Sequence, residues 1–145
     1  MDAKKKISTA KRAISLLERS LEKCTLCARM CGADRAGGER GVCGATGSEV
    51  EVFSYMPHFG EEPPLSGDHG SGTVFFSHCS MKCVYCQNYR FSQAGEGERI
   101  TSERLGDAFL ELQRLGCHNI NLVSPTHYAP HIVRALLYAW QQGLE

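Results

Sequence analysis

The sequence has no excess of charge of either sign, since sixteen Lys and Arg residues balance sixteen Asp and Glu residues. A balanced chain offers no basic surface for nucleic acid and no attraction to an anionic membrane. It also lacks any apolar run close to the roughly 20 residues that cross a bilayer. The lysines at positions 4–6 are not followed by the apolar segment of a secretory signal. We therefore predict no nucleic-acid partner and no membrane contact.

Cysteine, by contrast, is abundant, with eight in a chain of 145 residues. A chain with this many cysteines and no secretion signal is more typical of metal binding or catalysis in a reducing compartment than of a disulfide scaffold. The sequence thus predicts a cytoplasmic protein of single-domain length in which thiols carry the chemistry.

Three of the cysteines, Cys79, Cys83 and Cys86, lie within eight residues of one another. They follow an apolar segment, residues 74–76, that is typical of a buried strand, and a loop leaving it can turn all three thiolates toward one point. Thiolates suit iron–sulfur clusters, zinc or copper(I). A four-iron cluster held by three thiolates keeps one iron open to an outside ligand. A Cys83–Cys86 redox pair would leave Cys79 without a role, and a closed zinc site would need His78 or a distant cysteine as its fourth ligand.

The spacing C-x3-C-x2-C, with Tyr85 directly before the last cysteine, resembles the cluster loop of the radical S-adenosylmethionine (SAM) enzymes. Further segments are similar to one branch of that superfamily, the uncharacterised iron–sulfur proteins related to pyruvate formate-lyase activating enzyme. These segments are residues 58–67 (HFGEEPPLSG), 86–89 (CQNY) and 119–128 (NINLVSPTHY). The resemblance covers residues 24–145.

This resemblance implies an enzyme that reductively cleaves SAM to a 5′-deoxyadenosyl radical for hydrogen abstraction, with a 4Fe–4S cluster on the three cysteines. It implies that Tyr85 packs near the adenine and that Asn88 hydrogen-bonds close to the cluster. A Gly-Gly-Glu run usually meets the SAM amino group in the superfamily; here Ser124, Thr126 and His127 stand in its place and are candidates for that contact. The implied partners are a one-electron reductant such as flavodoxin or ferredoxin and an unidentified substrate, with a protein to be activated as one option.

A second group of cysteines, Cys24, Cys27, Cys31 and Cys43, lies nearer the N-terminus. Its segment has too little apolar content to fold around a core of its own, so a bound metal would organise it. Four thiolates fit a closed zinc site and fit a second iron–sulfur cluster equally well; a thiol cluster without metal is the third option. If both groups held passive metals, the chain would be a non-catalytic zinc or iron–sulfur module for structure or electron transfer, which is the alternative to an enzyme.

Apolar spacing predicts the remaining elements. We predict helices over residues 4–23, 101–115 and 130–143, and strands over residues 48–56, 74–76 and 119–123, with a linker at 94–98. Strands and helices alternate after residue 72, which favours a parallel sheet with right-handed crossovers. In such a sheet the loops that leave the strand ends lie on one face, so we expect the cysteine loop and residues 124–128 to converge.

Together with the resemblance, this order predicts the fold class: α/β, the N-terminal part of a radical SAM partial (β/α)6 barrel, preceded by a helix and a small cysteine-rich segment. We divide the chain into an amphipathic helix (1–23), a cysteine-rich metal-binding segment (24–47) and an incomplete radical SAM domain (48–145). A six-unit barrel takes on the order of 180 residues, and the chain after residue 72 suffices for two units. We therefore expect the N-terminal portion of a longer protein, with an open two-stranded parallel sheet.

Overall fold

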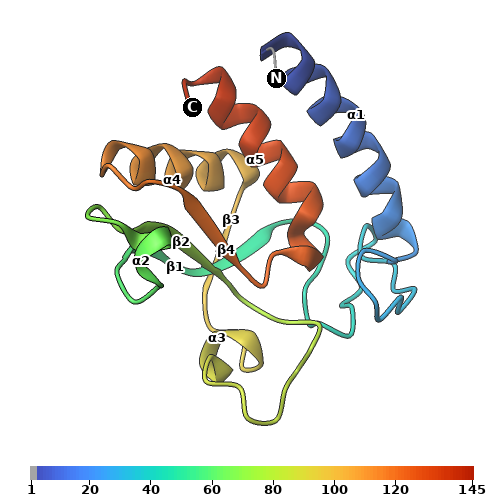
Figure 1. Ribbon diagram of the computed structural model, residues 1–145. Helices are drawn as coiled ribbons and strands as arrows, with labels where there is room; N and C mark the ends of the chain where they lie inside the picture. Colours follow the sequence, from blue (N-terminus) through green and yellow to red (C-terminus); the bar gives the residue numbers. More distant parts are fainter. Residues whose placement is uncertain (1–2) are drawn as a thin grey trace.

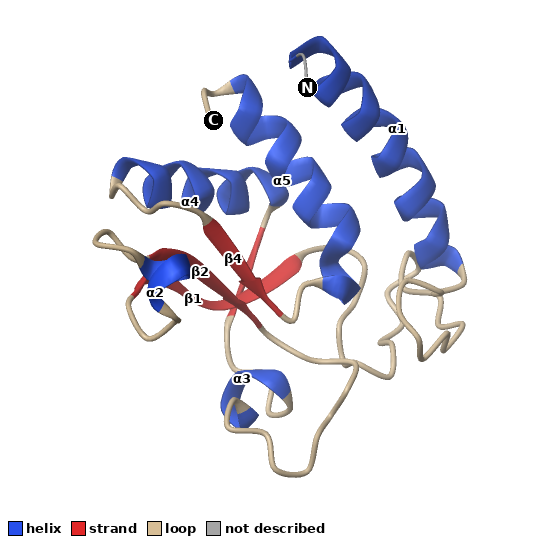
Figure 2. Cartoon of the chain, viewed as in Figure 1, coloured by secondary structure: helices blue, strands red, loops and turns tan. Residues whose placement is uncertain are grey.

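The computed structural model describes residues 3–145 as one sheet with helices packed on it (Figure 1). The elements are α1 (Ala3–Glu22), β1 (Val50–His58), α2 (Pro63–Ser66), β2 (Ser71–Phe76), α3 (Tyr89–Ser92), β3 (Glu98–Ile100), α4 (Ser102–Arg114), β4 (Ile120–Val123), the short 3-10 helix η1 (Thr126–Tyr128) and α5 (Ala129–Gln141). Figure 2 shows long loops between α1 and β1 and between β2 and α3, and these loops carry seven of the eight cysteines.

The sheet is mixed, and its strands lie in the order β3-β1-β2-β4. β1 pairs with β2 in antiparallel register, from Val52 opposite Phe76 to His58 opposite Ser71. β3 runs antiparallel to β1. β4 is parallel to β2, with Phe75 opposite Val123. The carboxyl ends of β2 and β4 therefore lie side by side.

The predicted N-terminal part of a (β/α)6 barrel is wrong. The prediction left the edge of β2 that faces away from β4 without a neighbouring strand. In the structure β1 pairs there in the antiparallel direction, and β3 lies beyond β1. The alternation over residues 48–56 indicates a strand, but it does not indicate which neighbour that strand pairs with. β3 was not predicted, because its three residues are too few to show an alternation of apolar and polar side chains. The first of them also lies in the predicted linker, residues 94–98. The result is a small α/β domain with a four-stranded mixed sheet.

The core lies between the sheet and α4 and α5. Its fully buried members include Val50, Val74 and Phe76 from the strands, together with Leu105 and Leu112 from α4. The helix predicted over residues 101–115 is thus confirmed, and its start is fixed by Thr101, whose hydroxyl accepts a hydrogen bond from the Arg104 amide at 3.2 Å. A Thr N-cap of this kind fixes where α4 begins, and so fixes which side chains reach the sheet.

The predicted N-terminal helix is α1, which packs against α5 (Figure 1). Its residues Ala10 and Leu21 are buried. Glu18 forms an ion pair with Arg134 of α5, and the ammonium of Lys6 lies 5.6 Å from the centre of the Trp140 ring. Residues 1 and 2, assigned to the same segment from the sequence, lie outside the described residues.

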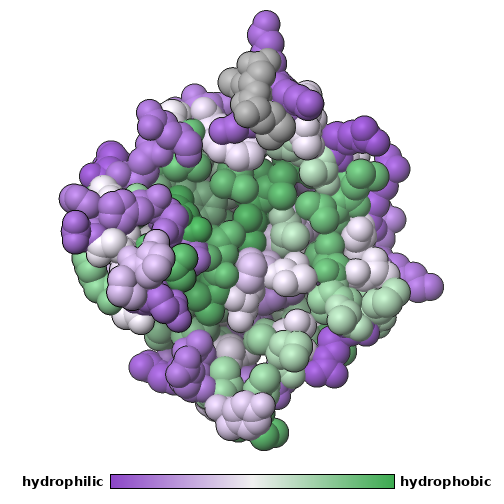
Figure 3. Space-filling model, viewed as in Figure 1, coloured by the Kyte–Doolittle hydropathy of each residue, from purple (hydrophilic) through white to green (hydrophobic). Residues whose placement is uncertain are grey.

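Apolar side chains also reach the surface on the face that carries α5. Figure 3 shows them along the middle of this face, with hydrophilic residues around the rim. Among the helices of residues 3–145, none combines the length and the apolar character that crossing a bilayer requires.

Candidate metal centre

The loop after β2 meets the loop after β4 at the carboxyl ends of the two parallel strands. The hydroxyl of Ser124 lies 3.8 Å from Cys79 Sγ and points its hydrogen bond at that sulfur. The His127 ring donates from Nε2 to the carbonyl oxygen of Ser77 at 3.0 Å. The convergence of these two loops, expected from the parallel pairing, is therefore present in the structure.

The three cysteines Cys79, Cys83 and Cys86 are each partly exposed. The Cys86 amide donates to the Cys83 carbonyl at 3.2 Å, which folds this part of the loop into a tight turn. The Gln93 side chain donates to the same carbonyl at 2.6 Å. The Ser92 hydroxyl lies 3.3 Å from Cys86 Sγ. Two of the three sulfurs thus have a serine hydroxyl within hydrogen-bonding range.

The Cys79 thiol is biased toward its ionised form. Partial burial raises its pKa, but the backbone amides of Met81 and Lys82 and the hydroxyl of Ser124 lower it by more, so the net pKa lies below the usual value. The Met81 amide is 3.4 Å from the sulfur. Because the thiolate is the form that binds metals, this loop prepares at least one of its cysteines for ligation.

The three sulfurs are not yet gathered around one point. Within residues 3–145, no group of three or more His, Cys, Asp or Glu side chains is arranged to hold a metal ion. Between the cysteines, Val84 is 94% exposed and Tyr85 is 88% exposed. Ligation would therefore require the exposed part of the loop to move inward, toward Cys79. The three thiols on this loop are ligands that suit an iron–sulfur cluster.

The remaining sequence-predicted residues differ in their placement. His127 is buried, and burial lowers its pKa to about 4, so the ring is neutral near pH 7 and ties the two loops together through its Nε2–H. Thr126 is exposed and Asn88 is half-buried, directly before α3. Tyr85 points into solvent rather than against a neighbour. Of His127 and Thr126, which follow β4, only His127 contacts the cysteine loop through a side-chain hydrogen bond.

A buried histidine–carboxylate pair beside the loop was not anticipated from the sequence. His78 Nε2 lies 3.1 Å from Glu51 Oε2, and the other oxygen of Glu51 is 3.5 Å from Arg99. The His78 ring is wedged between two glycines, Gly44 and Gly95, since a side chain at either position would approach the ring to less than 3 Å. His78 was considered only as a fourth zinc ligand, and Nε2 is already engaged by Glu51. The sequence carried no clear signal for this pair, because the alternation of Val50 and Val52 places Glu51 on the opposite, polar face of the predicted strand.

The N-terminal cysteine group lies next to this loop. Cys24 and Cys43 are buried, and Cys27 and Cys31 are half-buried. From the same segment, the guanidinium of Arg29 donates to the carbonyl oxygens of Ser80 at 2.8 Å and Met81 at 3.1 Å, both in the triad loop. The two cysteine-rich segments are therefore in direct contact.

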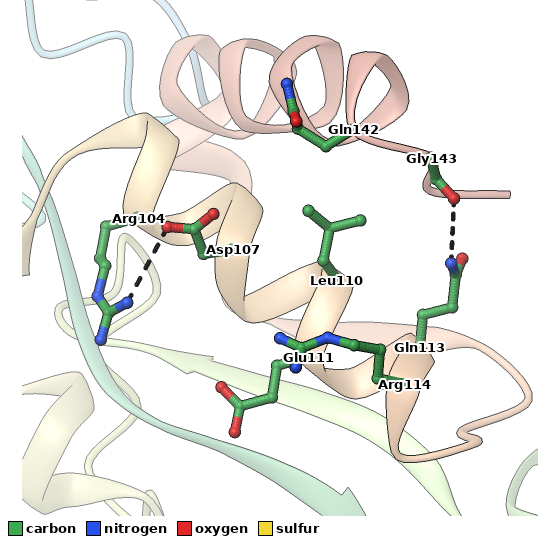
Figure 4. Close-up of a pocket in the computed structure, with 8 residues that line it drawn as sticks. All are labelled: Arg104, Asp107, Leu110, Glu111, Gln113, Arg114, Gln142 and Gly143. Carbon is green, nitrogen blue, oxygen red and sulfur yellow. Dashed lines mark hydrogen bonds and ion pairs between the residues drawn. The ribbon is translucent and has the colours of Figure 1, made fainter.

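A surface pocket of about 370 Å³ lies away from all of these residues, between α4 and the end of α5 (Figure 4). Its lining is largely polar, and its side chains are engaged with one another: Arg104 pairs with Asp107 at 4.0 Å, and Gln113 donates to the carbonyl oxygen of Gly143 at 3.1 Å. No cysteine lines it, so it is separate from the candidate metal centre.

Fold and site together define a small α/β protein with two cysteine-rich loops at one end of a mixed sheet. No protein-family model and no solved structure matches the chain. It is similar to an uncharacterised protein of Methanocaldococcus jannaschii, with 29% identity over 133 residues. The match covers 86% of this chain and 38% of the archaeal protein, so the chain spans well under half the length of that relative.

Proposed function

We propose that the chain is a radical SAM iron–sulfur protein in which Cys79, Cys83 and Cys86 hold a 4Fe–4S cluster. The observation that carries the proposal is the hydrogen bond from Ser124 to Cys79 Sγ. It ties the cysteine loop to the loop after the neighbouring parallel strand, where ligands of α/β sheets characteristically bind. The C-x3-C-x2-C spacing and the lowered pKa of Cys79 support the same assignment.

Each protein group has a defined part in this proposal. The cluster, when bound, supplies the electron that cleaves SAM to methionine and a 5′-deoxyadenosyl radical. The hydroxyls of Ser124 and Ser92 donate to ligand sulfurs, which spreads the thiolate charge and tunes the centre. Neutral His127 holds the two loops in register. The exposed ring of Tyr85 is free to pack against the adenine, while Asn88 and Thr126 lie on the same two loops.

The partners follow from the chemistry of such a centre. A one-electron reductant such as flavodoxin or ferredoxin would reduce the cluster in a reducing cytoplasm. The substrate would give up a hydrogen atom to the radical, and parts of the site outside the cysteine loop would select it. A partner protein activated by hydrogen abstraction is one such substrate. The alternative, a passive zinc or iron–sulfur module, needs the same thiols but no response to SAM.

The test is anaerobic reconstitution with iron and sulfide, followed by electron paramagnetic resonance of the reduced protein with and without SAM. We expect a 4Fe–4S signal that changes when SAM is added, and its loss in Cys79→Ala, Cys83→Ala and Cys86→Ala. Cys117→Ala is the matched control, because Cys117 packs against the core and lies in neither cysteine group. A cluster signal indifferent to SAM would favour the passive module, and failure to bind iron and sulfide at the triad would overturn the assignment.

A further inference from the structure

A fully buried arginine, Arg35, lies inside the N-terminal cysteine segment. Its side chain is 0% exposed. One terminal nitrogen donates to Cys24 Sγ at 3.7 Å, the other donates to the Thr46 carbonyl oxygen at 2.7 Å, and Nε has no hydrogen-bond partner. Within residues 3–145, no carboxylate forms an ion pair with this guanidinium. The arginine therefore carries a buried positive charge whose nearest candidate counter-charge is a cysteine sulfur.

A buried charge without a partner is strongly unfavourable, and arginine keeps its charge under all ordinary conditions. Neutral thiols do not balance it. Four metal-bound thiolates do, because a divalent ion with four thiolates has two net negative charges. We propose that Cys24, Cys27, Cys31 and Cys43 form a closed zinc site, with Arg35 as its buried counter-charge.

The backbone around the four cysteines supports this assignment. The sequence Cys-Gly-Ala occurs twice, at residues 31–33 and 43–45, and both glycines have a positive φ, +70° at Gly32 and +101° at Gly44. In each copy, the backbone amide of the alanine is directed at the sulfur of the cysteine two residues before it. A backbone amide directed at sulfur stabilises a metal-bound thiolate. The repeated loop thus presents two of the candidate zinc ligands in the same way.

The sulfurs approach one another from different parts of the segment. The Cys24 side chain lies near the Cys31 thiol. Gly41 lies close to the sulfurs of both Cys31 and Cys43, because a Cβ there would be 3.3 Å from Cys43 Sγ and 3.6 Å from Cys31 Sγ. The absence of a side chain at Gly41 lets the backbone close around the thiols.

These contacts favour a single ion over a second iron–sulfur cluster. Tetrahedral zinc with Zn–S bonds of about 2.3 Å places its sulfurs about 3.8 Å apart. The nearness of the Cys24 and Cys31 side chains is compatible with that spacing, whereas a cubane holds its ligand sulfurs well apart. Since the four side chains are not yet in ligating positions, zinc would draw them together by side-chain rotation and lock the segment.

The site would also position the triad loop. Arg29, between the second and third cysteines, holds two carbonyls of that loop, and Gly44 of the second Cys-Gly-Ala copy supports the His78 ring. Ala45 is fully buried in the main core. A metal that fixes residues 24–43 therefore fixes one wall of the candidate iron–sulfur site.

The test uses the full chain carrying Cys79→Ala, Cys83→Ala and Cys86→Ala together, so that only the N-terminal group can bind. We expect this triple variant to bind one zinc ion, and to give with cobalt(II) the absorption of a tetrahedral site with four thiolates. Adding Cys31→Ala should abolish that spectrum, and adding Cys117→Ala should leave it unchanged. A cobalt spectrum with fewer thiolates, or iron and sulfide retained by the triple variant after reconstitution, would overturn the zinc assignment.

Arg35 is tested on the same background. We expect Arg35→Gln to weaken zinc binding about 10- to 100-fold in competition with a chelator, as loss of an outer-shell partner does. Lys23→Gln removes an exposed charge beside Cys24 and should change zinc affinity little. Equal effects of the two substitutions would refute the role of Arg35. Since the triad is absent throughout, failure of the proposed radical SAM function leaves these results interpretable.

Discussion

Replacing Gly95 with alanine tests whether the His78 ring is held rigidly between two loops. Gly95 has φ +71°, and a Cβ there would lie 2.7 Å from His78 Cε1. The ring has little room to move, since Gly44 also lies against its Nδ1–Cε1 edge and Nε2 is bonded to Glu51 at 3.1 Å. Gly38→Ala is the matched control, because Gly38 has φ +95° but open space around it.

Both substitutions introduce a left-handed backbone strain of roughly 1–2 kcal/mol. Only Gly95→Ala must also displace His78 and break its buried hydrogen bond, which costs a further ~1–3 kcal/mol. A difference of that size lowers Tm by several degrees, at about 2–4 °C per kcal/mol for a domain of this size. Thermal and denaturant unfolding of the two variants, each against the parent chain, measures it. Equal losses of stability would show that His78 is free to move and that the wedge between the glycines does not exist.

The other predictions concern the site and the core. Because burial lowers the folded-state pKa of His127 to about 4, while an unfolded histidine titrates near 6.5, protons bind the unfolded chain preferentially as pH falls. The contribution of His127 to stability is thus present above about pH 6.5 and is lost between there and pH 4, by up to about 1.4 kcal/mol per pH unit. Denaturant unfolding at pH 7 and pH 5 should show a smaller change for His127→Gln than for the parent chain. Ser124→Ala removes a hydroxyl that lowers the pKa of Cys79, so alkylation of this thiol should shift to higher pH; an unshifted pH profile would contradict the Ser124 contact. Leu112→Ala opens a cavity in the core and should cost about 2–5 kcal/mol, whereas Leu115→Ala, on an exposed side chain, should change stability by about 0.5 kcal/mol or less.

Local patterns predicted the three long helices well, because their signals are contained within a few turns, whereas the short α2, α3 and η1 were not predicted. The spacing of Leu105, Phe109 and Leu112 and the cap at Thr101 place α4 to within a residue or two. The parallel pair β2 and β4 was also predicted, since an intervening helix favours that pairing. The convergence of two loops at their carboxyl ends followed from it.

The long-range partners could not be predicted in the same way. The alternation in β1 carries no information on whether β2 lies beside it or in which direction. The barrel prediction came from the family resemblance and from the alternation of strands and helices after residue 72, and neither of these revealed the antiparallel pairing of β1. Glu51 is a charged residue on a strand, and its burial depends on His78 and Arg99, which lie far along the chain. Arg35 appears in the sequence as one cation in a glycine-rich segment, and only its surroundings reveal that it is buried.

The packing of α1 on α5 has a consequence for how the chain reaches its native state. The Glu18–Arg134 ion pair joins residues 116 positions apart, and contacts between such distant segments form slowly. During synthesis α1 emerges before α5 and finds this partner helix only after both cysteine-rich loops have left the ribosome. Those thiols are therefore exposed to oxidants before the fold closes, so the chain is most sensitive to thiol oxidation in the interval before α5 docks.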